Sequence, residues 1–298
     1  EHFIYIENQY FIGASEHWED GDGEWNSWNV GTLNLIPAEL AAKVIAKIEE
    51  GKRFTVYVVM PLHPEGQPET LPLQEVLFWQ YKTVQFMYRD IAAAIDRCGL
   101  QAHPTDYLNF YFLGQREPPG ASTLPSDCVP RQQQQLASRR QMIYVHSKLM
   151  IVDDEFLIIG SANINQRSMA GDRDTEIAVV AYQPDYMKAK LGGDLPRGQV
   201  SGFRLSLWGE HLGEYQDLFL TPNSLECVRH INLRAEANWL LYVDTKVQPL
   251  GSHLCRYPWV ISQDGAVRPQ KPCFPDLEEL SARIKGKSNY VVPSLMTT

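Results

Sequence analysis

The alternation of strand-like and helix-like segments is the feature that most restricts the fold of this chain. Three apolar runs rich in β-branched and aromatic residues predict buried strands, and two helical patterns separate them. In chain order, the expected elements are a strand at 3–8, a helix at 37–51, a strand at 54–60, a helix at 72–99 and a strand at 107–113. This order is typical of parallel strands covered by helices. We therefore expect an α/β lobe with a mixed, mostly parallel sheet flanked by helices.

The second half of the chain adds further elements to this lobe. Strands are expected at 142–152 and 156–160, which an acidic turn joins, and at 175–182. One amphipathic helix then ends at residue 212, and shorter helices follow among many prolines. We place a boundary near Gly213, which divides the chain into a lobe at 1–213 and a C-terminal helical extension at 214–298.

Composition and charge narrow the classes of function. The 298 residues carry a net charge of −9, which argues against non-specific binding to nucleic acid. The five cysteines are scattered, without a Cys-x-x-Cys pair, so neither a disulfide framework nor a zinc ribbon is expected. This cysteine usage favours a reducing, intracellular compartment. The most apolar stretch, 54–62, is far shorter than the roughly 20 residues of a membrane-spanning helix. We expect a soluble or, at most, a peripheral membrane protein.

One short segment carries most of the chemical information. His146, Lys148 and Asp153 have the spacing His-x-Lys-x4-Asp, and they begin inside the strand expected at 142–152. Side chains two residues apart in a strand project from one face, so His146 and Lys148 should point the same way. An imidazole and an ammonium so placed repel each other when both are charged, and a phosphate between them makes the arrangement favourable. The segment therefore predicts a phosphate-binding site.

Three polar residues downstream extend this predicted site. Ser161 and Asn163 belong to a Gly-Ser-x-Asn sequence after the next strand, and they would supply neutral donors to phosphate oxygens. Glu176 begins a further strand and could accept the proton of the other imidazole nitrogen, which would fix the tautomer and orientation of His146. Glu176 could equally be an ordinary solvated acid at a strand end.

The combined pattern His-x-Lys-x4-Asp-x6-Gly-Ser-x-Asn resembles the signature of the phospholipase D superfamily. The flanking sequence, including 142–182 and the opening Ile6-Glu7-Asn8-Gln9-Tyr10-Phe11, is similar to the plant phosphatidylcholine-hydrolysing type, and the similarity spans the whole chain. The resemblance implies the fold of one phospholipase D lobe. It also implies hydrolysis of phosphatidylcholine and other glycerophospholipids to phosphatidic acid and a free alcohol through a phosphohistidine intermediate.

The family pattern has two such motifs, one in each lobe, and this chain has one. None of its seven other histidines is followed two residues later by lysine. The resemblance assigns the nucleophile to the absent first motif and makes His146 the general acid and base. It also implies that Lys148 and Asn163 hold the oxygens of the phosphoryl group, with Ser161 in support.

Gln9, Asp153 and Glu210 receive roles from the same resemblance. The amide of Gln9 would contact the substrate phosphate, or it would only cap the loop after the first strand. Asp153 belongs to the catalytic signature, although its place at a strand end, turned away from His146 and Lys148, favours a structural pairing with a basic group. Glu210 lies in a stretch whose glutamate is a calcium ligand in the family, and it could also be a surface acid of a helix. One carboxylate cannot make a calcium site of six to eight oxygens, so further ligands must lie elsewhere.

The resemblance also implies a cofactor and partners. Calcium is the expected cofactor, and the expected substrate is a phospholipid at a membrane surface. A missing N-terminal half would carry the first motif and a calcium-dependent lipid-binding domain, and the first residue, Glu1 rather than Met, fits a cut within a longer enzyme. The expected location is the cytoplasm, peripheral to the plasma membrane, with no nucleic-acid partner. Two alternatives remain open: an inert truncated product that binds lipid or a partner, and a single-motif phosphodiesterase or nuclease that acts as a homodimer.

Overall fold

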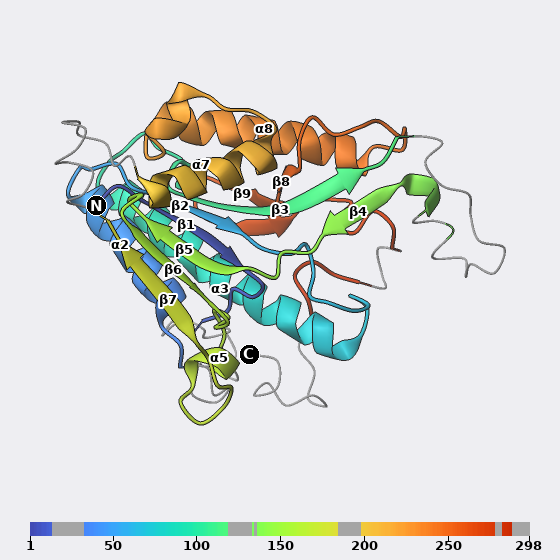
Figure 1. Cartoon of the computed structure of the whole chain (residues 1–298), viewed down its shortest axis with the longest axis horizontal. Helices are drawn as coiled ribbons and strands as arrows, with labels where there is room; N and C mark the ends of the chain where they lie inside the picture. The colour runs from blue at the N-terminus through green and yellow to red at the C-terminus, as the bar shows by residue number, and fades with distance from the viewer. Residues whose placement is uncertain (14–32, 119–132, 134–135, 184–197, 278–281, 288–298) are drawn as a thin grey trace.

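The computed structural model describes residues 1–13, 33–118, 133, 136–183, 198–277 and 282–287. These residues form an eight-stranded sheet, in which seven strands have the order β4-β3-β2-β1-β5-β6-β7 and the short β8 pairs with β3. The strands are β1 (Phe3–Asn8), β2 (Thr55–Val59), β3 (Leu108–Arg116), β4 (Arg140–Ile143), β5 (Lys148–Val152), β6 (Phe156–Gly160), β7 (Ala178–Tyr182) and β8 (Leu254–Arg256). A separate pair consists of β9 (Trp259–Ile261) and β10 (Val267–Pro269). Figure 1 shows β1 inside the main sheet and β7 at one edge.

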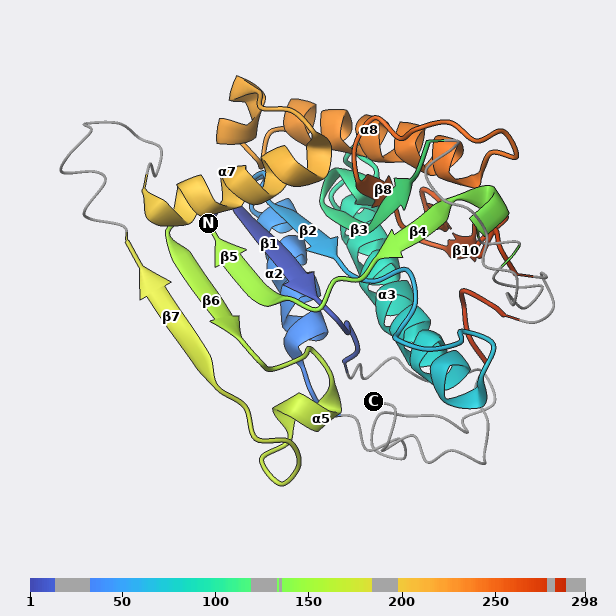
Figure 2. The same cartoon turned by 45° about the vertical axis from the view of Figure 1, so that its right-hand side comes forward.

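Helices cover both faces of this sheet. The α-helices are α2 (Ile36–Glu49), α3 (Leu71–Arg97), α5 (Gln166–Met169), α7 (Gln199–Leu212) and α8 (Leu225–Val243). Ile4 and Ile6 of β1 pack into the core that contains the buried side chains of α2 and α3, whereas Phe3 and Tyr5 pack into the core of α7 and α8. This alternation follows from the two-residue repeat of a strand. Figures 1 and 2 show the two layers of helices on opposite sides of the sheet.

The predicted mixed α/β sheet flanked by helices is confirmed, and its parallel part is smaller than expected. The strands expected at 3–8, 54–60 and 107–113 correspond to β1, β2 and β3, which pair in parallel. All other pairs in the main sheet of the described residues are antiparallel. The turn between β5 and β6, for example, is only three residues long. A parallel pair needs a crossover of a dozen or more residues, so these two strands can pair only in the antiparallel direction.

The single strand expected at 142–152 is wrong. The structure has two strands there, β4 beside β3 and β5 beside β1, and residues 144–147 connect them without regular secondary structure. Because β3, β2 and β1 lie between β4 and β5 in the sheet, the chain passes three strand positions within these four residues. His146 therefore precedes β5 instead of lying inside a strand with Lys148.

The C-terminal part of the chain completes the same sheet. The helix α8 spans 19 residues, which is longer than the short helices expected there, and β8 pairs with β3. Trp239 and Tyr242 of α8 belong to the core that also contains side chains of α3. The division into 1–213 and 214–298 stays a prediction. Within the described part of the chain, no helix is long and apolar enough to cross a membrane, and Cys98, Cys227, Cys255 and Cys273 are free thiols.

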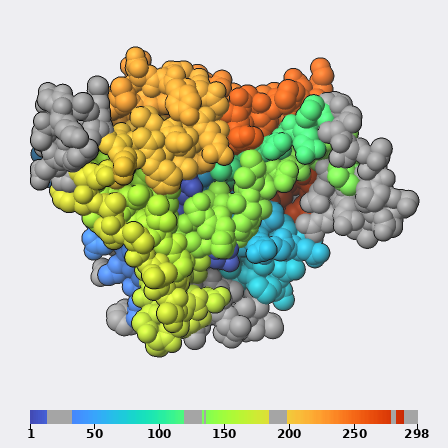
Figure 3. Space-filling model, viewed as in Figure 1, coloured from blue at the N-terminus to red at the C-terminus, as the bar shows by residue number. Residues whose placement is uncertain are grey.

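One edge of the sheet is exposed. In the described residues, no strand pairs with the outer edge of β7. Large apolar side chains on and beside this strand face solvent, among them Ile177, Val180 and Tyr182, and Val179 is 70% exposed. Figure 3 shows the atoms around β7 (yellow) on the molecular surface. An uncovered apolar edge of this kind is a surface on which another chain segment can pair.

Candidate active site

The site forms where β1 ends and β5 begins. The two strands are antiparallel, and Asn8 at the end of β1 is the register partner of Lys148 at the start of β5. This register brings Gln9, the next residue, beside Lys148. Lys148 Nζ donates to Gln9 Oε1 at 2.9 Å and to the backbone oxygen of His146 at 2.7 Å. Gln9, whose predicted contact with the substrate phosphate stays a prediction, therefore lies beside the lysine of the motif. Figure 2 shows this end of β1 and β5 on the same side of the molecule as α5.

Asn163 reaches the same point from the segment after β6. Ile12 donates its backbone N–H to the oxygen of Ile164 at 2.8 Å, and Ile164 donates to Asn8 Oδ1 at 3.1 Å. These bonds hold the two segments together, so that Asn163 Nδ2 lies 3.4 Å from Gln9 Oε1. Asn163 Oδ1 is buried and has no hydrogen-bond partner among the described atoms. A buried amide oxygen without a donor leaves a position for a ligand or a water molecule.

His146 lies beside this group and has an exposed side chain. In the described part of the chain, its ring makes no hydrogen bond, and the centroid of the Tyr144 ring is 6.4 Å from its own. The prediction that His146 and Lys148 share a strand face is wrong, because residues 144–147 are irregular. The two residues are nevertheless brought together by the bond from Lys148 Nζ to the backbone oxygen of His146.

Ser161 and Glu176 pair with each other. Ser161 Oγ donates to the Glu176 carboxylate and accepts the backbone N–H of Ile177 at 3.0 Å. The only proton of the Ser161 hydroxyl is therefore engaged, which differs from its predicted role as a phosphate donor. The predicted hydrogen bond between Glu176 and His146 is also not formed. Glu176 precedes β7, which is two strand positions from β5, and that spacing amounts to about 10 Å.

Partial burial changes the charge balance of the site. It lowers the pKa of Lys148, and the carboxylate of Glu176 opposes this shift. The ammonium of Lys148 is thus partly desolvated, and its hydrogen-bond partners are the neutral oxygens of Gln9 and His146. A phosphate at this position would restore the favourable charge interaction that water otherwise supplies.

Tyr144 is a site residue that the sequence did not reveal. Its hydroxyl oxygen accepts Gln9 Nε2–H at 2.9 Å and the backbone N–H of Glu65 at 3.0 Å. Glu65 belongs to the loop at 61–70, which precedes α3. The one available signal was the position of Tyr144 two residues before His146, because the contact with Gln9 joins residues 135 positions apart.

Asp153 lies at the opposite end of β5. Its Oδ1 accepts the backbone N–H groups of His2 and Phe3, both at 2.8 Å. Asp153 is five positions after Lys148, which corresponds to about 17 Å along an extended strand. The structural role expected for Asp153 therefore has a geometric basis: besides the two backbone N–H groups, its other oxygen pairs with the amino group of Glu1, which is a basic group but not a basic side chain. The adjacent Asp154 makes that pairing with Arg204.

Glu210 is exposed on α7. The described residues contain no group of three or more His, Cys, Asp or Glu side chains that could hold a metal ion. No cluster of carboxylates that could supply most ligands of a calcium site is therefore present around Glu210 in this part of the chain. Its predicted role as a calcium ligand stays untested, and the described residues alone do not fit that role.

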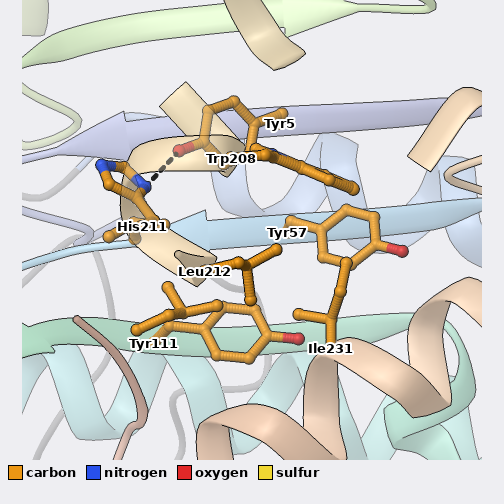
Figure 4. A pocket seen from close by; sticks show the side chains of 9 residues that line it. Tyr5, Tyr57, Tyr111, Trp208, His211, Leu212 and Ile231 are labelled. Carbon is orange, nitrogen blue, oxygen red and sulfur yellow. Dashed lines mark hydrogen bonds between the residues drawn. The ribbon is translucent and has the colours of Figure 1, made fainter. Parts of the chain in front are cut away.

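A second polar group lies beneath α7, next to Glu210 in sequence. Tyr5 donates its hydroxyl to Glu7 Oε1 at 2.6 Å, and His211 Nδ1 is 3.3 Å from the same hydroxyl. Figure 4 shows Tyr5 pointing toward His211 at a small cavity that Tyr57 and Trp208 also line. Burial lowers the pKa of His211, against the opposing charge of Glu7. These side chains contribute to packing between β1 and α7.

Comparisons with known proteins identify the family of the chain. Residues 1–286 match the family model for phospholipase D. The chain is 47% identical to phospholipase D delta of Arabidopsis thaliana over the whole chain and 33% of that relative. It is also 47% identical to phospholipase D alpha 1 of Zea mays, over the whole chain and 37% of that protein. The chain therefore spans about a third of the length of these curated relatives.

Proposed function

This chain belongs to the phospholipase D family, and from that membership we propose that it supplies the acid–base half of a phospholipase D active site. The complete enzyme would hydrolyse the terminal phosphodiester of phosphatidylcholine and related glycerophospholipids to phosphatidic acid and a free alcohol. The observation that supports this most directly is the convergence of Lys148, Gln9 and Asn163 beside the exposed imidazole of His146.

In the proposed reaction, a histidine outside this chain attacks phosphorus, and the bond from phosphorus to the alcohol oxygen breaks. His146 in its protonated form gives its proton to the departing alcohol. In the second step, neutral His146 removes a proton from water, whose oxygen attacks phosphorus and releases the first histidine. Another alcohol can replace water in this step. Lys148 and Asn163 would bind the non-bridging oxygens while charge shifts among them.

The proposal extends to the surroundings of the complete enzyme. The absent N-terminal part would carry the second histidine and a calcium-dependent lipid-binding domain, and the enzyme would act in the cytoplasm at the plasma membrane. The exposed apolar edge at β7 offers a surface for contact with that absent part. Calcium enters the proposal as a cofactor of the longer protein only, because Glu210 belongs to no potential metal-binding group in the described residues.

The test measures choline release from phosphatidylcholine vesicles. Three proteins are compared: this chain alone, the full-length protein, and the full-length protein with His146→Ala. We expect no turnover by the chain alone, turnover by the full-length protein, and a loss of at least 100-fold from His146→Ala. Full turnover by the isolated chain would contradict a site built from two halves. Cleavage of plasmid DNA by a dimer of the chain would favour the nuclease alternative, and an inactive full-length protein would favour the inert one.

A further inference from the structure

The hydroxyl of Tyr144 has no part in the reaction proposed above, although it lies within the site. It is 2.9 Å from Gln9 Nε2 and 3.0 Å from the backbone nitrogen of Glu65. The ring is half-buried, and its centroid is 6.4 Å from that of His146. Tyr144 thus lies between the amide of Gln9, the loop at 61–70 and the imidazole of His146.

Lys148 determines the direction of these hydrogen bonds. An ammonium group can only donate, so Gln9 must turn Oε1 toward Lys148 Nζ, which is 2.9 Å away. The Nε2 group of the same amide then faces Tyr144 and donates to the phenolic oxygen. The backbone N–H of Glu65 also donates to this oxygen. A tyrosine hydroxyl accepts at most two hydrogen bonds and donates one, so the O–H proton is its only remaining hydrogen-bonding capacity.

This proton has no acceptor among the described residues, because the two recorded bonds of the hydroxyl both end on its oxygen. We propose that Tyr144 donates its hydroxyl proton to a non-bridging oxygen of the substrate phosphodiester and is a further substrate-binding residue of this site. The proposal rests on the proposed function for the identity of that substrate. It adds a neutral donor to the Lys148 ammonium and the Asn163 amide.

The surroundings of Tyr144 prepare it for this role. Two donors from different elements hold the oxygen, one from the segment after β1 and one from the loop before α3. That loop is itself fixed, since the buried Tyr257 hydroxyl donates to the backbone oxygen of Leu62 at 2.9 Å. A donor held in place before the ligand arrives needs little reorganisation when it binds an anion. The relay from Lys148 through Gln9 to Tyr144 also polarises the hydroxyl and strengthens it as a donor.

The experiment uses the full-length protein and two readouts, the binding of inorganic phosphate by calorimetry and choline release from phosphatidylcholine vesicles. A hydrogen bond to a charged acceptor corresponds to roughly a 10- to 100-fold change in affinity. We expect Tyr144→Phe to weaken phosphate binding and to lower kcat/KM, each by about this factor. Tyr215→Phe, which removes a hydroxyl from a side chain that is 72% exposed, is the matched control and should change neither readout.

A double-mutant cycle separates donation to the substrate from orientation of Gln9. If Tyr144 acted only through Gln9, then Tyr144→Phe would have no further effect in a Gln9→Ala background. We expect an effect of about tenfold or more to persist there. Its disappearance in that background overturns the proposal, and so does equal phosphate binding by the wild type and Tyr144→Phe.

Two further results distinguish the remaining outcomes. Phosphate binding that depends on Tyr144 in a protein without choline release would refute the proposed function and leave this proposal standing. If Tyr144→Phe lowers the unfolding temperature markedly, 3-fluorotyrosine at position 144 keeps the packing and makes the hydroxyl a stronger donor. Phosphate binding tighter than in the wild type is then expected, and unchanged binding would overturn the proposal.

Discussion

Two adjacent aspartates in the turn after β5 offer a sharp test of how this lobe is stabilised. Asp153 and Asp154 both have positive φ, 56° and 59°, a conformation that asparagine also tolerates. Arg204 is fully buried, and its Nε and Nη2 donate to the two oxygens of Asp154 at 2.6 and 2.7 Å. Asp154 is the only carboxylate paired with Arg204 within the described ranges.

Replacing Asp154 with Asn keeps the shape of the turn and removes the charge that balances Arg204. The guanidinium then stays buried, with an amide N–H₂ group facing one of its donors. Removing one partner of a buried ion pair costs about 3–5 kcal/mol. Asp153→Asn is the matched control, because an amide oxygen can still accept the backbone N–H groups of His2 and Phe3, and the ion pair that it loses is with the exposed amino group of Glu1. Replacing the charged acceptor with a neutral one weakens these bonds, which should lower the free energy of unfolding by about 1 kcal/mol.

The assay is urea unfolding of the chain and its variants at neutral pH, with the free energy of unfolding extrapolated to water. We expect a large loss for Asp154→Asn and a small one for Asp153→Asn. Adding Arg204→Met to Asp154→Asn removes the unpaired charge and should recover part of the loss, because apolar replacements of buried pairs are often neutral. A smaller loss at Asp154 than at Asp153, or no recovery in the double variant, would refute this reasoning.

Three further outcomes are expected. Burial lowers the pKa of both His103 and His211, so the unfolded chain binds these protons more readily. The free energy of unfolding should then be highest above the unfolded pKa of about 6.5 and fall at lower pH. Urea unfolding from pH 7.5 to 5 measures this fall, which should be less steep in the His103→Gln and His211→Gln variants. Gln9→Glu should place a carboxylate on Lys148 and weaken phosphate binding at least tenfold by calorimetry, without loss of stability. Val179→Lys should reduce self-association of the isolated chain in sedimentation velocity, since Val179 is 70% exposed on an unpaired edge.

The parts of the fold that the sequence predicted are those in which local pattern and packing agree. β1, β2 and β3 are continuous apolar runs because both of their faces are buried, and the predicted helix at 72–99 matches α3 to within two residues. The single strand predicted at 142–152 is wrong for a physical reason. Ile143 and Val145 continue the alternation of apolar residues through the irregular segment at 144–147. Periodicity cannot show that a chain leaves one position in a sheet and enters another.

The sequence predicted the site residues that belong to one continuous segment. It did not predict contacts that depend on how distant segments pair in the sheet. The spacing of the motif indicated Lys148 and Asn163, and resemblance added Gln9. The partners of Tyr144 could not be read from the chain, because they lie in segments 135 and 79 positions away. The acidic turn was ambiguous in a similar way. Asp153 and Asp154 have the same side-chain chemistry and similar backbone conformations, and only the position of α7 determines which one meets Arg204.

The balance of donors and acceptors explains why this arrangement suits an anion. Two acceptors at the site are already engaged, Gln9 Oε1 by Lys148 and Asn163, and the Glu176 carboxylate by Ser161, and the acceptor without a partner, Asn163 Oδ1, is buried. The Tyr144 proton and the partly desolvated Lys148 ammonium keep donor capacity. A phosphodiester carries a negative charge, and its oxygens accept hydrogen bonds. It therefore complements these donors, whereas a cation or a ligand rich in donors would not. We therefore expect the site to prefer anionic groups, because of how its own polar atoms are paired before any ligand binds.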